Sequence, residues 1–184
     1  PAGDGSAETP YILRTAADVD GIRGKIVENE IKYFAMVNDI DMSAMTTWTA
    51  IVTGSPYTKG IDFNGNDRVI SNFKCNTGAY RSFFGVLNGK CHNVTFDNAS
   101  VDATVNTNST CAAIISAYGG NTGGIFADIQ DVHISGSVIG NNAGSNMRLR
   151  RSLHFLQYRK HEDQHRHSYK PCPQSYQAFL LHQN

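Results

Sequence analysis

Two aspartates close together in the chain are its first candidates for chemistry. Asp39 and Asp41 alternate within Asn38–Ser43, so in an extended strand both carboxylates lie on one face. Calcium prefers several hard oxygen ligands, and these carboxylates with the Asn38 amide beside them predict a Ca²⁺ site. The alternative is an outward polar face whose oxygens accept hydrogen bonds from neighbouring backbone. No other cofactor is expected.

A second pair of aspartates lies in the segment GIDFNGNDRVISNF, residues 60–73. Asp62 and Asp67 are candidates for the acid pair of a polysaccharide-degrading enzyme, which uses two carboxyl groups around the scissile bond. The same residues fit a simple turn, because Asn64-Gly65 favours positive φ. Serines in the chain lack the Gly-x-Ser-x-Gly context of a nucleophile. The sequence therefore favours a non-catalytic protein and leaves enzyme activity open.

Three tyrosines are the candidate contacts for a bound ligand. Tyr57, Tyr80 and Tyr118 each lie beside glycine- or proline-containing turns, where an aromatic ring can stay exposed. Trp48 and Phe83 lie in apolar segments and are expected in the core.

The four cysteines are scattered and show no Cys-x-x-Cys spacing, so a zinc site is not expected. We predict that Cys75, Cys91, Cys111 and Cys172 are small buried hydrophobic side chains.

Short extended segments must position these residues. They alternate apolar and polar residues and are separated by Asn, Gly, Asp and Ser. No helical stripe interrupts them, which argues against a sheet built from βαβ units. The segments expected as strands are Ile31–Val37, Asn38–Ser43, Trp48–Val52, Gly60–Phe63, Val69–Phe73, Phe83–Leu87, Val94–Phe96, Ala99–Val105, Ala112–Ala117, Gly124–Ile129, Val132–Ile134 and Ser137–Ile139.

One amphipathic helix is predicted near residues 15–28, ahead of the strands. Thr15 and Asp18 fit a capping box at its start. Val19, Ile22 and Ile26 then form one apolar stripe that needs an apolar surface to pack on.

The extended segments repeat along the chain. Residues 85–101 align with residues 124–138 if one gap is allowed: both begin Gly-apolar-apolar and contain Asn/Asp-Val-x-Phe/Ile. Residues 67–73 supply a third copy of the central part, with one extra residue. Repeats of this kind predict the stacked rungs of a solenoid. The centres of the three copies are Val69, Val94 and Val132.

These centres are about 25 and about 38 residues apart. A loop inserted at Asn106–Thr110 is expected to account for the longer interval. His92 and His133 occupy different positions relative to their valines, so they are not expected to stack and are predicted to face solvent.

Several separate pieces resemble, in the same order, bacterial surface proteins with GLUG-type repeats. The resemblance covers about residues 8–145. The pieces that carry it are Thr9–Leu13, Val37–Ser43, Trp48–Ile51, Ile61–Asn66 and Phe83–Leu87.

The resemblance implies an all-β fold, a short right-handed parallel β-helix of the pectin-lyase-like kind. In such a coil each strand pairs with the rungs before and after it, and the corners need Gly or Asn. The open end of the coil would expose apolar core and a sheet edge. The helix near 15–28 is therefore expected to cap it.

Charge and composition change abruptly near residue 146. Residues 1–146 hold nine lysines and arginines against fourteen acids, whereas residues 147–184 hold seven against two. The seventeen glycines lie before Met147, and five of the seven histidines lie after it. We expect residues 1–146 to form the β-helix domain, and residues 147–184 to be a basic, His- and Gln-rich tail that is disordered or not native to the fold.

The resemblance implies an extracellular or cell-surface, adhesin-like module that binds a glycan or a protein. Nucleic-acid binding is not expected, although a basic helix led by Arg148 remains an alternative for the tail. Histidines of the tail that could bind a metal, His161 and His165, are a further alternative. No apolar run is long enough to span a membrane. The alternative function is a fragment of a β-helical polysaccharide-degrading enzyme or of a phage tail-spike.

Overall fold

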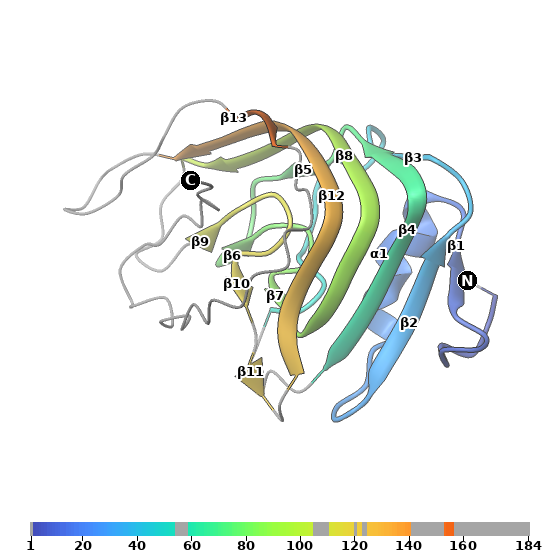
Figure 1. The fold of residues 1–184 in the computed structure, drawn as a ribbon. Coiled ribbons are helices and arrows are strands. Elements are labelled where there is room, and N and C mark those ends of the chain that lie inside the picture. Colours follow the sequence, from blue (N-terminus) through green and yellow to red (C-terminus); the bar gives the residue numbers. More distant parts are fainter. Residues whose placement is uncertain are drawn as a thin grey trace.

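The structure is a computed structural model that describes residues 2–53, 59–104, 111–119, 121–122, 125–140 and 153–156. These residues are mostly β-strand, with one short α-helix and one 3₁₀ turn. Long curved strands lie side by side, from β1 and β2 near the N-terminus to β12 (Figure 1). The expected all-β class with parallel strands is therefore confirmed.

The largest sheet in the described part of the chain has nine strands. Parallel pairing joins β1 to β2, β2 to β4, β4 to β8 and β8 to β12. Strands β3 and β5 also pair in parallel, with β4 and β8, whereas β11 and β13 pair antiparallel with β12. The strands are β1 Tyr11–Leu13, β2 Ile31–Met36, β3 Ile40–Asp41, β4 Gly60–Ser71, β5 Lys74–Cys75, β8 Gly89–Ala103, β11 Asn121–Thr122, β12 Ile125–Gly140 and β13 Leu153–Leu156.

Two smaller sheets contain one parallel pair each. Strand β6 (Tyr80–Arg81) pairs with β9 (Cys111–Ala112), and β7 (Val86–Leu87) pairs with β10 (Tyr118–Gly119). Next to these two sheets, the segments around Ile51, Phe83 and Ile114 stack on one another through single backbone hydrogen bonds and form no longer β-ladder. The Ile51 amide donates to the Phe83 carbonyl, and the Phe83 amide donates to the Ile114 carbonyl.

The strands predicted at Trp48–Val52 and Ala112–Ala117 are therefore wrong in extent. Within them the structure has only an isolated bridge at Val52 and the end of β9. These segments are extended and stacked, but each makes too few successive ladder bonds to continue as a strand.

The segment GIDFNGNDRVISNF does not fold back on itself. Strand β4 joins the two predicted strands Gly60–Phe63 and Val69–Phe73 into one bent strand. It pairs in parallel with β2 and β3 on one side and with β8 on the other. The chain therefore proceeds forward from strand to strand, and a hairpin is excluded for this segment.

The corner of β4 lies two residues later than the predicted Asn64-Gly65 turn. Positive φ occurs at Asn66 and Asp67, so the assignment to Asn64-Gly65 is wrong. Gly65 is needed for another reason: a Cβ there would lie 2.4 Å from the Val94 Cβ. The next strand thus approaches too closely for a side chain at residue 65.

The alignment of the repeats agrees with the register of the strands at two of its three centres. Val94 pairs with Val132, as the alignment predicts. Val69 pairs with Thr95 instead, so its copy is displaced by one residue. At the corner, three residues of β4 (65–67) lie between the paired Asn64 and Arg68, where β8 has Asn93 alone, so β4 holds two more residues there than β8.

A short helix precedes the strands and is shorter than the predicted range 15–28. Helix α1 spans Ala16–Asp20, and the 3₁₀ turn η1 continues it over Gly21–Gly24. The predicted capping box is present: the Thr15 hydroxyl accepts from the Asp18 amide, and the Asp18 carboxylate accepts from the Thr15 amide. Two glycines weaken the helix after its first turns, which is a physical reason for its early end.

The apolar stripe of the helix is buried, and so is a large aromatic cluster. Val19 and Ile22 are fully buried and belong to the same core as the strands. Trp48 and Phe83 are also fully buried, as predicted, and their rings stack 5.2 Å apart. The other fully buried phenylalanines are Phe34, Phe63, Phe73, Phe84 and Phe96.

The cysteines that the structure describes are buried thiols, as predicted. Cys75, Cys91 and Cys111 are buried and form no disulfide. Burial raises the pKa of Cys75 and that of Cys91, so both stay protonated at neutral pH. Cys172 lies outside the described residues.

Much of the predicted tail also lies outside the described residues. Within 147–184 the structure describes residues 153–156, as strand β13. The loop expected at Asn106–Thr110 lies outside them as well. Among the described residues, we find no helix with the length and apolar character needed to span a membrane.

Candidate functional site

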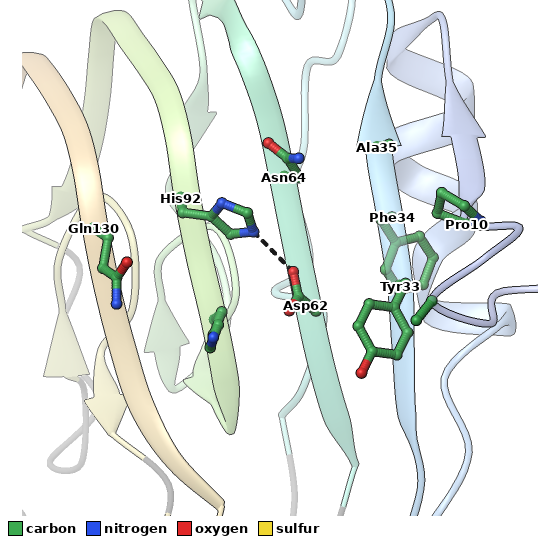
Figure 2. Close-up of a pocket in the computed structure, with 10 residues that line it drawn as sticks. Pro10, Tyr33, Phe34, Ala35, Asp62, Asn64, His92 and Gln130 are labelled. Atoms are coloured by element: carbon green, nitrogen blue, oxygen red, sulfur yellow. Dashed lines mark hydrogen bonds and ion pairs between the residues drawn. The ribbon is translucent and has the colours of Figure 1, made fainter.

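A polar hollow lies on the outer face of the main sheet, across β2, β4, β8 and β12 (Figure 2). Its volume is about 240 Å³. Ala7 and Pro10, from the segment ahead of β1, line it at the end nearest β2. The sheet contributes the other lining residues, which are Tyr33, Phe34, Ala35, Asp62, Asn64, Lys90, His92 and Gln130.

Strand alternation and parallel register place these side chains together. Successive side chains of a strand point to opposite faces. Phe63 and Cys91 therefore point into the core, and their neighbours along the chain point outward. The register pairs Tyr33 with Asp62 and Asp62 with Lys90.

A second outward row lies two residues further along each strand. Asn64 pairs with His92, and His92 pairs with Gln130. Neighbouring strands are about 4.8 Å apart, and residues two apart along a strand are separated by about 6.6 Å. The two rows thus bring planar polar groups and one aromatic ring within reach of one small ligand.

The centre of the hollow is an ion-pair-like contact between Asp62 and His92. The His92 Nε2 lies 2.9 Å from the Asp62 Oδ1, and both side chains are only about one-fifth exposed, at 23% and 20%. The side-chain nitrogen of Asn93 (Nδ2) lies 3.2 Å from the His92 Nδ1 and 3.4 Å from the Asn64 Oδ1. An amide nitrogen can only donate, so Nδ1 accepts and the proton of a neutral His92 lies on Nε2, facing Asp62.

Several polar atoms of the hollow have no partner among the described residues. The Lys90 ammonium makes no ion pair with them, and the Asp62 Oδ2 accepts no hydrogen bond from them. The Asn64 Oδ1 accepts from the Asn66 amide and the Asn93 side chain, which leaves its NH₂ group to donate. The hollow therefore presents both donors and acceptors to a ligand.

Asp39 and Asp41, the predicted calcium ligands, lie beside a different corner of the sheet. The Asp39 Oδ1 accepts from the Val69 amide at 2.9 Å. The Asp41 Oδ1 accepts from the Asn72 amide group at 2.9 Å, and the Asp41 Oδ2 accepts from the Ser43 hydroxyl at 2.8 Å. These carboxylates connect one strand to the next, in the way the alternative interpretation expects.

Calcium binding by Asp39 and Asp41 stays a prediction. No group of three or more His, Cys, Asp or Glu side chains is arranged for a metal in the described ranges of the chain. Asn72 and Ser43 would have to give up their hydrogen bonds to Asp41 if a cation bound there.

The predicted tyrosine contacts are not brought together on one sheet. Tyr80 lies on β6 and Tyr118 on β10, and both side chains are half-buried. Tyr118 packs against the core. Tyr57 lies outside the described residues. Ligand binding by these tyrosines also stays a prediction.

The candidate acid pair Asp62 and Asp67 is separated by the corner. Asp62 is on the straight part of β4, and Asp67 is an exposed corner residue with positive φ. An acid pair formed by Asp62 and Asp67 stays a prediction.

His92 and His133 do not stack, as predicted, because His92 pairs with Gln130 and His133 with Thr95. His92 is not simply solvent-facing, however, and that prediction is corrected by its contact with Asp62. The grouping of Asp62, Lys90 and His92 was missed because it depends on strand register. The sequence pattern that could have revealed this group is the alternation of polar and apolar residues: Asp62 and Asn64 flank Phe63, and Lys90 and His92 flank Cys91.

The chain matches no protein-family model. It is similar to a curated protein of Evansella cellulosilytica named "Putative Gly-rich membrane protein", with 30% identity over 135 residues. That alignment covers 70% of this chain and 15% of the relative. "Halomucin" of Haloquadratum walsbyi is 34% identical over 109 residues, which cover 54% of this chain and 1% of the relative. The chain thus spans only a small part of these relatives.

A solved structure is similar in both sequence and fold. It is the crystal structure of a "putative immunoglobulin A1 protease" from Bacteroides ovatus, with 34% identity and a TM-score of 0.66. The similarity covers 77% of this chain and 42% of that chain.

Proposed function

We propose that this chain is part of a cell-surface, adhesin-like protein and binds a glycan or a protein through the polar hollow. The chain forms a short right-handed parallel β-helix with GLUG-type repeats in this proposal. The observation that carries it is the register of β2, β4, β8 and β12, which gathers Asp62, Lys90 and His92 in one depression.

Parallel pairing in chain order supports the β-helix. Strands β2, β4, β8 and β12 pair consecutively, and the segments at Ile51, Phe83 and Ile114 stack in the same order. Consecutive parallel strands need crossovers, which are right-handed in about 98% of cases. Helix α1 lies beside β1 and β2 and caps this end of the coil in the proposed fold (Figure 1).

The names of the relatives support a location at the cell surface. One relative is named a membrane protein, and the solved relative is named a protease of immunoglobulin A1. Adhesin-like display would give the outer face of the sheet access to an extracellular partner.

The composition of the hollow supports binding rather than covalent acyl transfer. The residues that line it include no serine, threonine or cysteine. Cys91 points to the opposite, buried face. Covalent acyl transfer needs such a nucleophile beside a base, so the described lining does not supply that route to peptide cleavage.

A second candidate is a fragment of a β-helical polysaccharide-degrading enzyme or tail-spike. The contact between Asp62 and His92 in a hollow favours it, because such a pair can move a proton at the site. Release of reducing sugar or unsaturated product from uronate polymers would support this candidate. Loss of that release in Asp62→Asn would place the reaction in the hollow.

The proposed function is tested by presenting the full chain to a glycan array and to an array of extracellular proteins. We expect binding to a small set of glycans or proteins, with the heat-unfolded chain as control. Absence of signal above that control on both arrays would contradict the proposal.

A further inference from the structure

We propose that the hollow binds one saccharide unit with adjacent hydroxyl groups, held by Asp62, Asn64 and Lys90 beside the Tyr33 ring. This inference rests on the proposed function and narrows its ligand to a sugar at this site.

The inventory of donors and acceptors is the first argument. The Lys90 ammonium and the Asn64 NH₂ group can only donate, and the Asp62 Oδ2 can only accept. Each sugar hydroxyl both donates and accepts. Two adjacent hydroxyls can therefore donate to the Asp62 Oδ2 and accept from the Lys90 ammonium or the Asn64 NH₂ group, which make no hydrogen bond or ion pair with the described residues.

The spacing of the side chains is the second argument. Asp62 and Lys90 are direct register partners, so their backbones are about 4.8 Å apart. The long, flexible Lys90 side chain and the short Asp62 side chain can then contact hydroxyl groups on neighbouring carbons of one sugar ring. Tyr33 is the register partner of Asp62 on the opposite side, and its ring stands beside Asp62 in Figure 2. An aromatic face can pack against the apolar C–H face of a sugar.

The size of the hollow agrees with one sugar unit. Its volume of about 240 Å³ is below the range of about 300–1,000 Å³ of drug-sized pockets. A single pyranose ring with its hydroxyls fits such a space, and a longer glycan would extend out of it along the sheet.

The site is poorly suited to an extended peptide. A peptide that adds to a sheet needs an unpaired strand edge. Both edges of these two strands, β4 and β8, are paired. Strand β4 pairs with β2 and β3 on one edge and with β8 on the other, and β8 pairs with β12 on its second edge. The face of the sheet therefore offers side chains only, which suits a polyol better than a peptide backbone.

His92 acts as a positioning residue in this arrangement. Its Nε2 fixes the Asp62 Oδ1, which leaves Oδ2 for the ligand, and Asn93 holds the ring from the other side. His92→Gln can still place an N–H donor near Asp62, so it should retain affinity, whereas His92→Ala should weaken it. If His92 contributed only by packing, the His92→Gln variant would not retain more affinity than the His92→Ala variant.

The experiment measures the affinity of the full chain for methyl glycosides of glucose, galactose, mannose and N-acetylglucosamine by saturation-transfer NMR titration. Their 3-deoxy and 4-deoxy analogues test the need for adjacent hydroxyls. Asp62→Asn keeps an acceptor for His92 but removes the charged Oδ2, and Lys90→Met removes the ammonium. We expect each to weaken the best glycoside about tenfold to hundredfold, because hydrogen bonds to charged groups are lost.

Matched controls remove the same charges elsewhere. Asp67→Asn lies at an exposed corner where Asn tolerates the positive φ, and Lys74→Met lies on β5, outside the hollow. Both should bind as the parent chain does. Thermal melting of every variant checks that the fold is retained.

Each outcome separates the inference from the proposed function. Glycoside binding that is unchanged in Asp62→Asn and Lys90→Met would overturn the inference and leave a glycan-binding protein. Array binding to proteins alone would also overturn it and leave the proposed function in its protein form. Absence of any binding partner would overturn both.

Discussion

At the scale of single residues, carboxylates and amides of this protein mainly join one strand to the next. Asp41 accepts from Asn72, and Asn72 accepts from Asn98, so a line of polar side chains crosses three successive segments. In the hollow, the Asp62 Oδ2, the Asn64 NH₂ group and the Lys90 ammonium are not used in this way by the described residues. The same residue types thus serve structure at a corner and are available to a ligand on a flat face.

The Asp41 contacts predict an acid-sensitive step in stability. The hydrogen bond from Asn72, followed by those from the Ser43 amide and hydroxyl, lowers the pKa of Asp41. A carboxyl whose pKa is lowered on folding stabilises the protein above its unfolded pKa of about 3.9 and loses this effect as the pH falls through the folded pKa. Melting temperatures between pH 6 and pH 2 should fall less steeply in Asp41→Asn. Equal slopes in both proteins would contradict the prediction.

The predicted Ca²⁺ site at Asp39 and Asp41 has a direct test. If a cation binds there, EDTA should lower the melting temperature, because a ligand of the folded state stabilises it by mass action. Asp39→Asn with Asp41→Asn should abolish the difference between EDTA and added Ca²⁺. A melting temperature of the parent chain that is the same in EDTA and in Ca²⁺ would contradict the predicted Ca²⁺ site.

At the scale of elements, the long bent strands depend on corner residues that tolerate unusual backbone geometry. Asn72, Asn93 and Asn98 have positive φ, with values between 52° and 57°. Asparagine adopts this conformation more readily than most residues, and its amide can also bond to the next strand.

Asn98 allows the two contributions to be separated. Asn98→Ala loses the hydrogen bond to Asn72 and must place an alanine at positive φ, so it should destabilise the fold by roughly 2–3 kcal/mol. Asn98→Gly loses the bond without the steric cost and should cost roughly 1 kcal/mol. Chemical denaturation measures both. Equal losses in the two variants would show that φ is not the cause.

Gly65 allows the close approach of β8 to be tested. Gly65→Ala should destabilise by roughly 1–3 kcal/mol, because the new Cβ would overlap the Asn93 carbonyl and the Val94 side chain. Gly24→Ala is the control, since its Cβ would meet no atom within 4 Å. That variant should keep or slightly raise the free energy of unfolding. A neutral Gly65→Ala would contradict the close packing.

At the scale of the whole molecule, one core serves the helix and the strands. Val19 of α1, Trp48 and the buried phenylalanines belong to one hydrophobic cluster. Trp48 is the single tryptophan of the chain and is fully buried. Its fluorescence therefore reports on the packing of the entire domain.

The expected boundary near residue 146 predicts that residues 1–146 fold without residues 147–184. The truncated chain should melt cooperatively, within about 2–4 °C of the full chain, because a loss below about 1 kcal/mol shifts a domain of this size by that amount. Trp48 fluorescence and far-UV circular dichroism measure the transition. Loss of cooperative melting on truncation would show that the tail, including β13, belongs to the fold.

The sequence by itself determined the local features of this protein. The alternation of apolar and polar residues, the capping box at Thr15 and Asp18, and the buried Trp48 and Phe83 follow from short-range physics, and the structure confirms them. The parallel all-β class also followed, from the resemblance and from repeats whose Val94 and Val132 centres do pair.

Only the tertiary structure decided which outward residues meet. Asp62 and His92 are thirty residues apart in the chain, and their 2.9 Å contact depends on the register of β4 with β8. Beyond Asn64 the register changes, because the corner of β4 holds two more residues than the corner of β8 at Asn93, and no local pattern reveals this. A shift by one residue would turn every side chain to the opposite face, so the packing of Phe63 and Cys91 in the core decides what lies in the hollow.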